Sequence, residues 1–150
     1  MTFAFTQLSE HSYSEAFQIQ TTCHSHPWSE AVFADCLSSP YFSFQMHAND
    51  SYKDVVGYYV GLAVAGEATL MDIGVKDSQR GKGYAKLLMQ HFLAQCKVNH
   101  CNEVWLEVRE SNFVAIRLYE NFGFQLIEIR KGYYPTESGR ENGLIMQLKT

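Results

Sequence analysis

The feature that most constrains the fold of this chain is a glycine-containing loop between an apolar strand and an amphipathic helix. The loop, Arg80–Ala85, reads Arg-Gly-Lys-Gly-Tyr-Ala and follows the apolar segment 68–75. Glycines let a backbone approach an anion closely, and the first N–H groups of a helix are unpaired donors. The pattern therefore predicts a loop that holds a phosphate. The helix behind it is predicted from apolar residues at helical spacing: Ala85, Leu88, Met89, Phe92, Leu93 and Cys96.

Two common nucleotide loops do not match this segment. A P-loop needs Ser or Thr after its lysine, but Gly83 follows Lys82. A Rossmann fingerprint needs a third glycine where Lys86 stands. Taken alone, the segment is also explained by a turn without a ligand, in which the glycines serve only the geometry of the backbone. Because Arg80, Lys82 and Lys86 gather here on a chain of net charge −4, a phosphorylated small molecule is a better ligand than nucleic acid.

The composition indicates one folded domain spanning residues 1–150. Hydrophobic residues make up 46% of the chain, which is ample for a single core. No apolar run is long enough to cross a bilayer, and the first seven residues lack the basic start of a signal peptide, so we expect a cytoplasmic protein. The cysteines show no Cys-x-x-Cys spacing, and the histidines near them fit no zinc pattern. We therefore expect reduced thiols and no metal.

The order of predicted elements is that of an α+β protein, with a mostly antiparallel sheet of about seven strands and about four helices. The strands are expected at 3–8, 41–46, 55–64, 68–75, 104–109, 124–129 and 144–148. The helices are expected after a capping box at 12–15, from Ser29 to Cys36, from 85 to 98, and from a Ser111 or Asn112 cap to Gly123. Residues 49–51 are predicted to form a turn, and residues 131–143 a loop with an aromatic turn.

Three motifs in the second half of the chain recur in a fixed order. They are Arg80-x-x-Gly83-x-Ala85, then Val104–Arg109, then Ser111–Phe124. Together they resemble the GNAT superfamily of acetyl-CoA-dependent N-acetyltransferases, although Arg80 and Ala85 depart from its commonest loop. The resemblance implies the GNAT fold and a pyrophosphate of coenzyme A held by the backbone of Gly81, Lys82, Gly83, Tyr84, Ala85 and Lys86.

The resemblance also implies roles for the strand before the loop and for a helix cap. In this family the strand carrying Ile73, Gly74 and Val75 pairs with the pantetheine arm and supplies an N–H to the thioester oxygen. Asn112 would contact coenzyme A as well as cap a helix. A glycine inside a strand often marks a bulge or a close backbone approach, which suits Gly74 to this role, but a packing glycine explains it equally well.

Glu107 is the main candidate for catalysis. Alternation along Val104–Arg109 places it on one face with Trp105 and Arg109, and a carboxylate beside tryptophan is expected to be partly shielded from water. A structural ion pair with Arg109 is the competing interpretation. The resemblance implies that Glu107 is the general base. It likewise implies that Tyr119 is the general acid, whereas the helical pattern alone favours a core tyrosine.

Segments over nearly the whole chain are most similar to the branch of the superfamily that acetylates the N-terminal alanine of a small-subunit ribosomal protein. These segments are 26–30, 66–70, 105–109, 133–136 and 139–141. This similarity implies a basic ribosomal protein as partner and peptide contacts at Trp28, Tyr133 and Tyr134. Exposed acids such as Glu137 and Glu141 could attract such a peptide. Acetylation of other N-termini, of lysine or of small amines, and acyl-CoA binding without turnover, remain alternatives.

Overall fold

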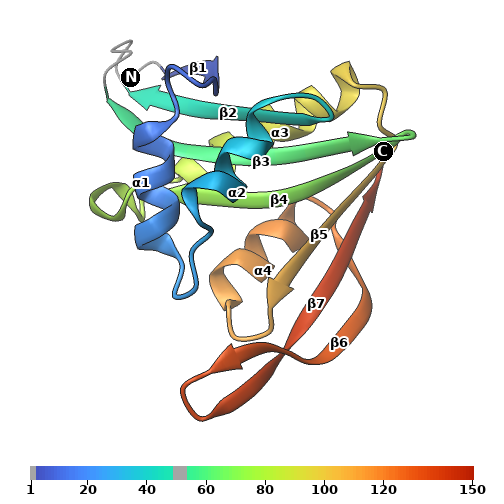
Figure 1. The fold of residues 1–150 in the computed structure, drawn as a ribbon. Helices are drawn as coiled ribbons and strands as arrows, with labels where there is room; N and C mark the ends of the chain where they lie inside the picture. The colour runs from blue at the N-terminus through green and yellow to red at the C-terminus, as the bar shows by residue number, and fades with distance from the viewer. Residues whose placement is uncertain (1–2, 49–53) are drawn as a thin grey trace.

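The computed structural model describes residues 3–48 and 54–150, whose strands join one seven-stranded sheet with helices against it (Figure 1). The turn expected at 49–51 lies outside these residues. The strands are β1 (Phe3–Gln7), β2 (Tyr41–Ala48), β3 (Val55–Val64), β4 (Glu67–Val75), β5 (Glu103–Arg109), β6 (Gln125–Thr136) and β7 (Gly139–Lys149). The helices are α1 (Ser14–Cys23), α2 (Glu30–Ala34), α3 (Tyr84–Val98) and α4 (Phe113–Asn121), with short 3-10 turns η1 (Asp35–Leu37) and η2 (Asp77–Gln79).

The strands lie in the order β1-β2-β3-β4-β5-β7-β6. Neighbouring strands run antiparallel except β4 and β5, which run parallel. The expected mixed, mostly antiparallel sheet of seven strands with four helices is thus confirmed. Within the residues described, no helix is both long and apolar enough to span a membrane.

The sheet opens in its middle, between β4 and β5. Backbone pairing joins Glu67–Leu70 only to Glu103–Leu106. Both strands continue beyond this ladder, β4 to Val75 and β5 to Arg109, and they diverge as they do so. The second half of β4 therefore keeps β3 on one side but has no β5 residue paired with it on the other. Such a backbone edge can bind an extended ligand.

A β-bulge in β4 lies at the point where the strands separate. Val60 of β3 is opposite Asp72 and Gly61 is opposite Leu70, so Met71 is an extra residue in β4. A bulge changes the face on which the following side chains lie. Leu70 accordingly belongs to the core beneath α3, whereas Asp72 lies on the face of Val60, which belongs to the core beneath α1.

Two hydrophobic cores hold the helices against the sheet. One contains Leu88 and Phe92 of α3 together with Tyr119 of α4. The other contains Ile19 of α1 and Phe33 of α2. Figure 1 shows α1 and α2 in front of the sheet and α3 behind it. Burial of these apolar faces is the main favourable term for docking the helices.

Gly74 does not mark the bulge, which lies at Met71. A Cβ built on Gly74 would lie 2.6 Å from Cε1 of Tyr58, so the side chain of this buried tyrosine occupies the space beside the glycine. The packing interpretation of Gly74 therefore applies.

Replacing Gly74 by Ala is expected to lower the free energy of unfolding by about 1–3 kcal/mol, because the added methyl group overpacks the site. Urea denaturation measures the loss. In a Tyr58→Leu background the same replacement should cost less, because the ring that it strikes is gone. Equal costs in both backgrounds would contradict the assigned contact.

Two local predictions are wrong. α1 begins at Ser14 with Tyr13 as its N-cap residue and has no side-chain cap hydrogen bond, so the expected capping box does not form. The expected loop 131–143 is instead mostly strand, because β6 and β7 form a long hairpin that runs to Thr136 and Gly139. The aromatic turn is therefore part of β6. The caps at Ser29 and Asn112 are confirmed, each accepting a backbone N–H of the first helical turn.

Candidate active site

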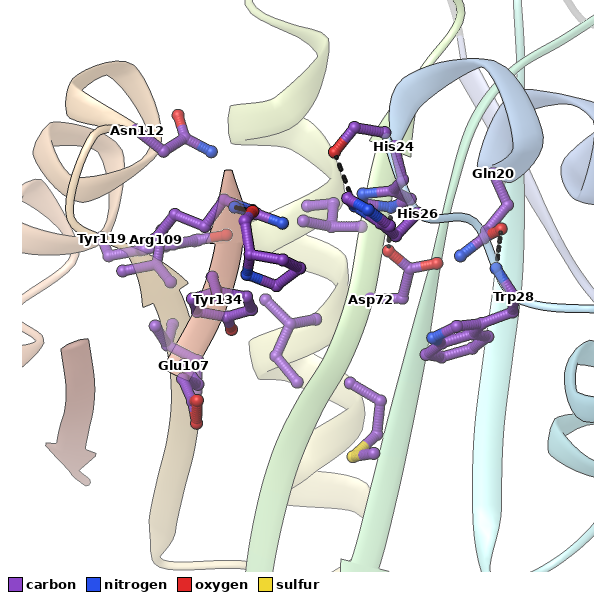
Figure 2. Close-up of a pocket in the computed structure, with 17 residues that line it drawn as sticks. Gln20, His24, His26, Trp28, Asp72, Glu107, Arg109, Asn112, Tyr119 and Tyr134 are labelled. Carbon is purple, nitrogen blue, oxygen red and sulfur yellow. Dashed lines mark hydrogen bonds and ion pairs between the residues drawn. The ribbon is translucent and has the colours of Figure 1, made fainter. Parts of the chain in front are cut away.

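A cavity of about 340 Å³ opens where β4 and β5 diverge (Figure 2). Three parts of the chain form its walls: the end of α1 with the segment that follows, the middle of β4, and the end of β5 with nearby residues of α4 and β6. The lining residues are Gln20, His24, Ser25, His26, Trp28, Leu70, Met71, Asp72, Ile73, Leu106, Glu107, Val108, Arg109, Asn112, Tyr119, Tyr134 and Pro135.

Glu107 reaches the cavity from β5, as its position beyond the β4–β5 ladder allows. Its side chain is only 21% exposed and forms a 3.0 Å ion pair with Arg130 of β6. The expected partner, Arg109, is instead bound to Glu141 at 3.0 Å. The structural interpretation of Glu107 therefore named the wrong arginine. Tyr134 is a second hydrogen-bond partner of Glu107. A carboxylate has about four lone-pair sites, so Glu107 can still accept a proton or hold a water molecule.

Tyr119 lies in α4, is 5% exposed, and lines the cavity while its ring packs near Phe124. Burial is the main cause that raises the pKa of its hydroxyl, and the nearby negative charge of Asp72 adds to it. The hydroxyl therefore stays protonated at neutral pH. A buried phenol facing a cavity is suited to donate its proton to an anion formed there.

Asn112 and Ile73 also line the cavity. Asn112 Oδ1 caps α4 by accepting the N–H of Ala115 at 3.2 Å, which fixes the side chain at the cavity rim. Gly74 and Val75 follow Ile73 on the β4 edge that β5 leaves unpaired, but neither residue lines the cavity. Any role of these two residues must therefore use the backbone.

The glycine loop lies outside the cavity and leads from β4 into α3. Gly81 and Gly83 have φ values of +77° and +80°, a conformation that strongly favours glycine. Apart from the residues adjacent in the chain, no atom of the described residues lies within 4 Å of the position that a Cβ would take at either glycine. Residues 84–86 form the first turn of α3, and the Tyr84 side chain is buried, so this residue offers the surface only its backbone.

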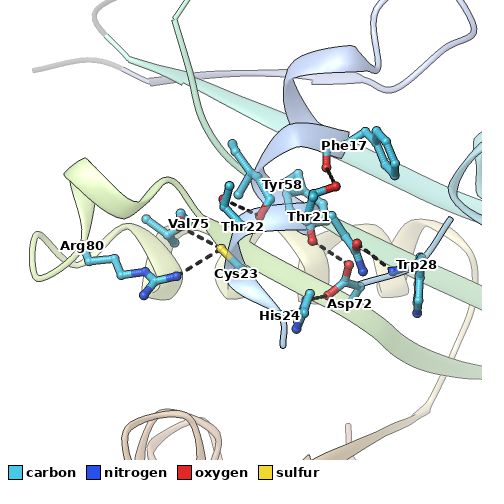
Figure 3. Close-up of polar contacts among 12 residues, drawn as sticks. Phe17, Thr21, Thr22, Cys23, His24, Trp28, Tyr58, Asp72, Val75 and Arg80 are labelled. Atoms are coloured by element: carbon cyan, nitrogen blue, oxygen red, sulfur yellow. Dashed lines mark hydrogen bonds and ion pairs between the residues drawn. The ribbon is translucent and has the colours of Figure 1, made fainter. Parts of the chain in front are cut away.

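The cations of the loop are held by neighbours. Arg80 donates to the Cys23 sulfur at 3.2 Å (Figure 3) and forms a 3.0 Å ion pair with Asp77. Lys82 donates to Gln79 at 3.0 Å. These side chains are surface groups that can move to an anionic ligand at low cost. The loop thus combines open space beside the backbone of its two glycines, a helix N-terminus and positively charged side chains.

The three residues expected to contact a peptide are placed differently. Trp28 and Tyr134 line the cavity from opposite sides, as Figure 2 shows, but Tyr133 does not. The exposed Tyr133 ring lies under the Arg130 guanidinium at 3.6 Å. Glu141 is already bound by Ser111 and Arg109, which lower the pKa of its carboxyl in that order of importance, so it is not free to attract a basic peptide.

The sequence predictions missed a buried polar group on the β4 side of the cavity. Asp72 binds His24 at 2.7 Å and Tyr58 at 2.6 Å. Nearby, Oε1 of the buried Gln20 side chain accepts a hydrogen bond from the backbone N–H of Trp28 at 3.0 Å and so holds the segment after α1. A lone acid inside the apolar segment 68–75 was the available signal. Among the described residues, no three His, Cys, Asp or Glu side chains are grouped as a metal site requires.

Comparison with known proteins assigns the chain to a family. The Acetyltransferase (GNAT) family profile matches residues 9–124. The [ribosomal protein bS18]-alanine N-acetyltransferase of Escherichia coli K12 is 37% identical over 133 residues, covering 89% of this chain and 88% of the relative. Its Haemophilus influenzae counterpart is 33% identical over 142 residues, covering 94% of each. A crystal structure of the ribosomal-protein-S18-alanine N-acetyltransferase from Escherichia coli superposes with a TM-score of 0.91 at 34% identity, covering 99% of this chain and 94% of that one. The chain therefore belongs to the GNAT acetyltransferase family.

Proposed function

We propose that this protein transfers the acetyl group of acetyl-CoA to the N-terminal α-amine of ribosomal protein bS18, with alanine as the acceptor residue. The observation that carries the proposal is the cavity between the diverging strands β4 and β5, which brings Glu107 and Tyr119 to one space. The choice of acceptor rests on relatives named for bS18 alanine, which are 33–37% identical to this chain. A ribosomal acceptor implies a cytoplasmic enzyme.

GNAT enzymes use acetyl-CoA, and the residues present fit that substrate. The edge of β4 from Met71 to Val75 has no partner in β5, so the backbone groups that face away from β3 can pair with the pantetheine arm, except the Val75 carbonyl, which accepts a hydrogen bond from Cys23 Sγ at 3.3 Å. The loop from Arg80 to Lys86 ends in the N-terminal turn of α3, whose unpaired N–H groups and partial positive charge suit a pyrophosphate. Asn112 at the cavity rim would make a further contact with coenzyme A.

The reaction follows from the acid–base groups of the cavity. The α-ammonium group must lose two protons on the way to an amide, and Glu107, directly or through a water molecule, accepts one of them. When the amine attacks the thioester carbon, negative charge develops on the thioester oxygen, and a backbone N–H near Gly74 or Val75 stabilises this oxyanion. Tyr119 then protonates the departing thiolate. The amine attacks directly in a ternary complex, so none of the four cysteines is required as a nucleophile.

Replacing Gly83 by Ala is expected to raise the KM for acetyl-CoA about tenfold or more, with little change in kcat. The new methyl group disfavours the φ of +80° and occupies space assigned to the pyrophosphate. S-acetylpantetheine lacks the pyrophosphate and serves as the control substrate. The kcat/KM for S-acetylpantetheine should be the same in the wild type and in Gly83→Ala. An equal loss with both substrates would contradict the assignment of the loop.

Steady-state kinetics with a peptide panel test the acceptor. Peptides beginning Ala-Arg, Ser and Met, and a blocked peptide with an internal lysine, are supplied with acetyl-CoA. The Ala-Arg peptide is expected to have the highest kcat/KM. Preference for another N-terminus, or for the lysine, would identify one of the alternative acetyltransferase activities. Binding of acetyl-CoA without transfer to any peptide or small amine would instead identify an acyl-CoA-binding module.

A further inference from the structure

Acetylation removes two protons from an α-ammonium group, and the cavity has candidate acceptors on two sides. The first proton must leave before attack, and the second leaves the nitrogen as the amide forms. Glu107 lies on the β5 side, while His24 lines the cavity beside β4 (Figure 2). We propose that His24 is a second catalytic residue, which accepts the first proton, and that Asp72 positions it. This inference rests on the proposed function.

The bulge at Met71 places Asp72 where it can hold His24. Because of the extra residue, Asp72 lies on the α1 face of β4 rather than among the apolar residues beneath α3. Its side chain is only 4% exposed, and both carboxylate oxygens are bound, one by His24 and the other by the Tyr58 hydroxyl (Figure 3). A buried carboxylate fixed in this way is a rigid anchor for an imidazole.

The hydrogen bond to Asp72 also sets the tautomer of His24. An ionised carboxylate can only accept, so Nε2 of His24, which lies 2.7 Å from Oδ1 of Asp72, carries the hydrogen. In the neutral ring Nδ1 then carries the lone pair. Among the described residues Nδ1 has no hydrogen-bond partner, and the side chain is 38% exposed at the cavity. Nδ1 is thus available to a substrate amine or to an intervening water molecule.

The charges around His24 suit a base that works near neutral pH. The hydrogen bond to Asp72 raises the pKa of His24, against burial and the repulsion of Arg109 and Arg80. Both arginines are themselves paired with acids, Arg109 with Glu141 and Arg80 with Asp77. An α-amine has a pKa of about 8, so an imidazole with a raised pKa accepts its proton at little cost.

The proposed proton transfers balance. The α-ammonium group gives its first proton to Nδ1 of His24, and the neutral amine forms the C–N bond. The C–S bond then breaks, and the thiolate takes the proton of Tyr119. The second amine proton goes to Glu107 and returns through water to the Tyr119 oxygen. His24 releases its proton to solvent, so each turnover yields one amide, one coenzyme A thiol and one free proton.

The pH dependence of turnover in His24→Gln and Asp72→Asn tests the inference, with His11→Gln as the matched control. His11 is an exposed surface histidine. With the Ala-Arg peptide at saturation, wild-type kcat should rise as pH increases through the pKa of His24. In the His24→Gln protein kcat at pH 7 should fall about tenfold or more, and the rise of kcat with pH through the His24 pKa, the acidic limb of the pH profile, should disappear. The KM for acetyl-CoA and the melting temperature serve as checks of the fold.

Asp72→Asn separates proton transfer from a purely structural role. Removing the carboxylate removes the main cause of the raised pKa, so the limb should move to lower pH while kcat falls. NMR titration of the His24 ring should show the same downward shift. An unchanged kcat and limb in His24→Gln, with an active wild type, would overturn this inference alone. Absence of transfer by the wild type would overturn the proposed function and this inference with it.

Discussion

Replacing Glu107 by Gln is expected to lower kcat about 100-fold or more while acetyl-CoA binds as tightly as before. Glutamine keeps the shape of the side chain but cannot accept a proton, and general base catalysis typically contributes a factor of about 10²–10⁴. The loss should be greater at pH 6 than at pH 9, because at the higher pH hydroxide from the solvent can take the proton in place of Glu107. Kinetics across this range, with calorimetric titration of coenzyme A, measure both quantities.

Glu103→Gln is the matched control for this replacement. Glu103 lies on the same strand and face, but within the part of β5 that is paired with β4 and away from the cavity. Its replacement should leave kcat unchanged. The Glu107 replacement also breaks the ion pair with Arg130, whose side chain is 42% exposed, so we expect a stability change of only about 1 kcal/mol or less. Wild-type turnover by Glu107→Gln at every pH would rule out Glu107 as a base.

Replacing Tyr119 by Phe is expected to lower kcat about 100-fold, with the fold and the affinity for coenzyme A preserved. Phenylalanine keeps the ring that packs near Phe124 and removes only the hydroxyl, whose pKa is raised mainly by burial. Without that proton the thiolate must leave as an anion or take a proton from water. Steady-state kcat and thermal unfolding distinguish this loss from a folding defect.

Tyr59→Phe provides the control for a lost buried hydroxyl. Tyr59 belongs to the same hydrophobic core as Tyr119, and its hydroxyl bonds His91 of α3 rather than reaching the cavity. Its replacement should lower stability by about 1 kcal/mol and leave kcat close to wild type. If both variants lost activity equally, the effect would come from the core, and the general acid role of Tyr119 would be wrong.

The sequence was most informative where a local pattern decides the structure. The apolar periodicity predicted α3, and the glycine loop before it adopts the positive φ values that only glycine accepts easily. A cap at Ser111 or Asn112 was predicted for the same reason, since a side-chain oxygen satisfies the first N–H groups of a helix, and the structure shows that Asn112 is the cap. These features depend on neighbours within a few residues.

The β6–β7 hairpin could not be predicted in this way. Gly132, Pro135 and Gly139 indicated a loop, yet the segment pairs along most of its length. Pro135 is tolerated because β6 is the edge strand of the sheet and its outer side needs no ladder donor. The pairing of distant backbone groups outweighed the local turn signals.

The polar contacts of the cavity were also beyond local reasoning. The partner of Glu107 is Arg130, which lies 23 positions away, and the partner of Asp72 is His24, which lies 48 positions away. The bulge that turns Asp72 toward α1 has no glycine to mark it, since the extra residue is Met71. Such contacts arise only when the sheet is assembled.

A crystal structure with a bisubstrate analogue, in which coenzyme A is joined through an acetyl linker to the N-terminal nitrogen of an Ala-Arg peptide, tests the central claim most directly. The account predicts that the linker lies in the cavity between β4 and β5, with the pyrophosphate at the loop from Arg80 to Lys86. The peptide nitrogen should lie within reach of Glu107 directly or through one water molecule, and the sulfur should lie near the Tyr119 hydroxyl. A linker bound outside this cavity, or a nitrogen remote from Glu107, would contradict it.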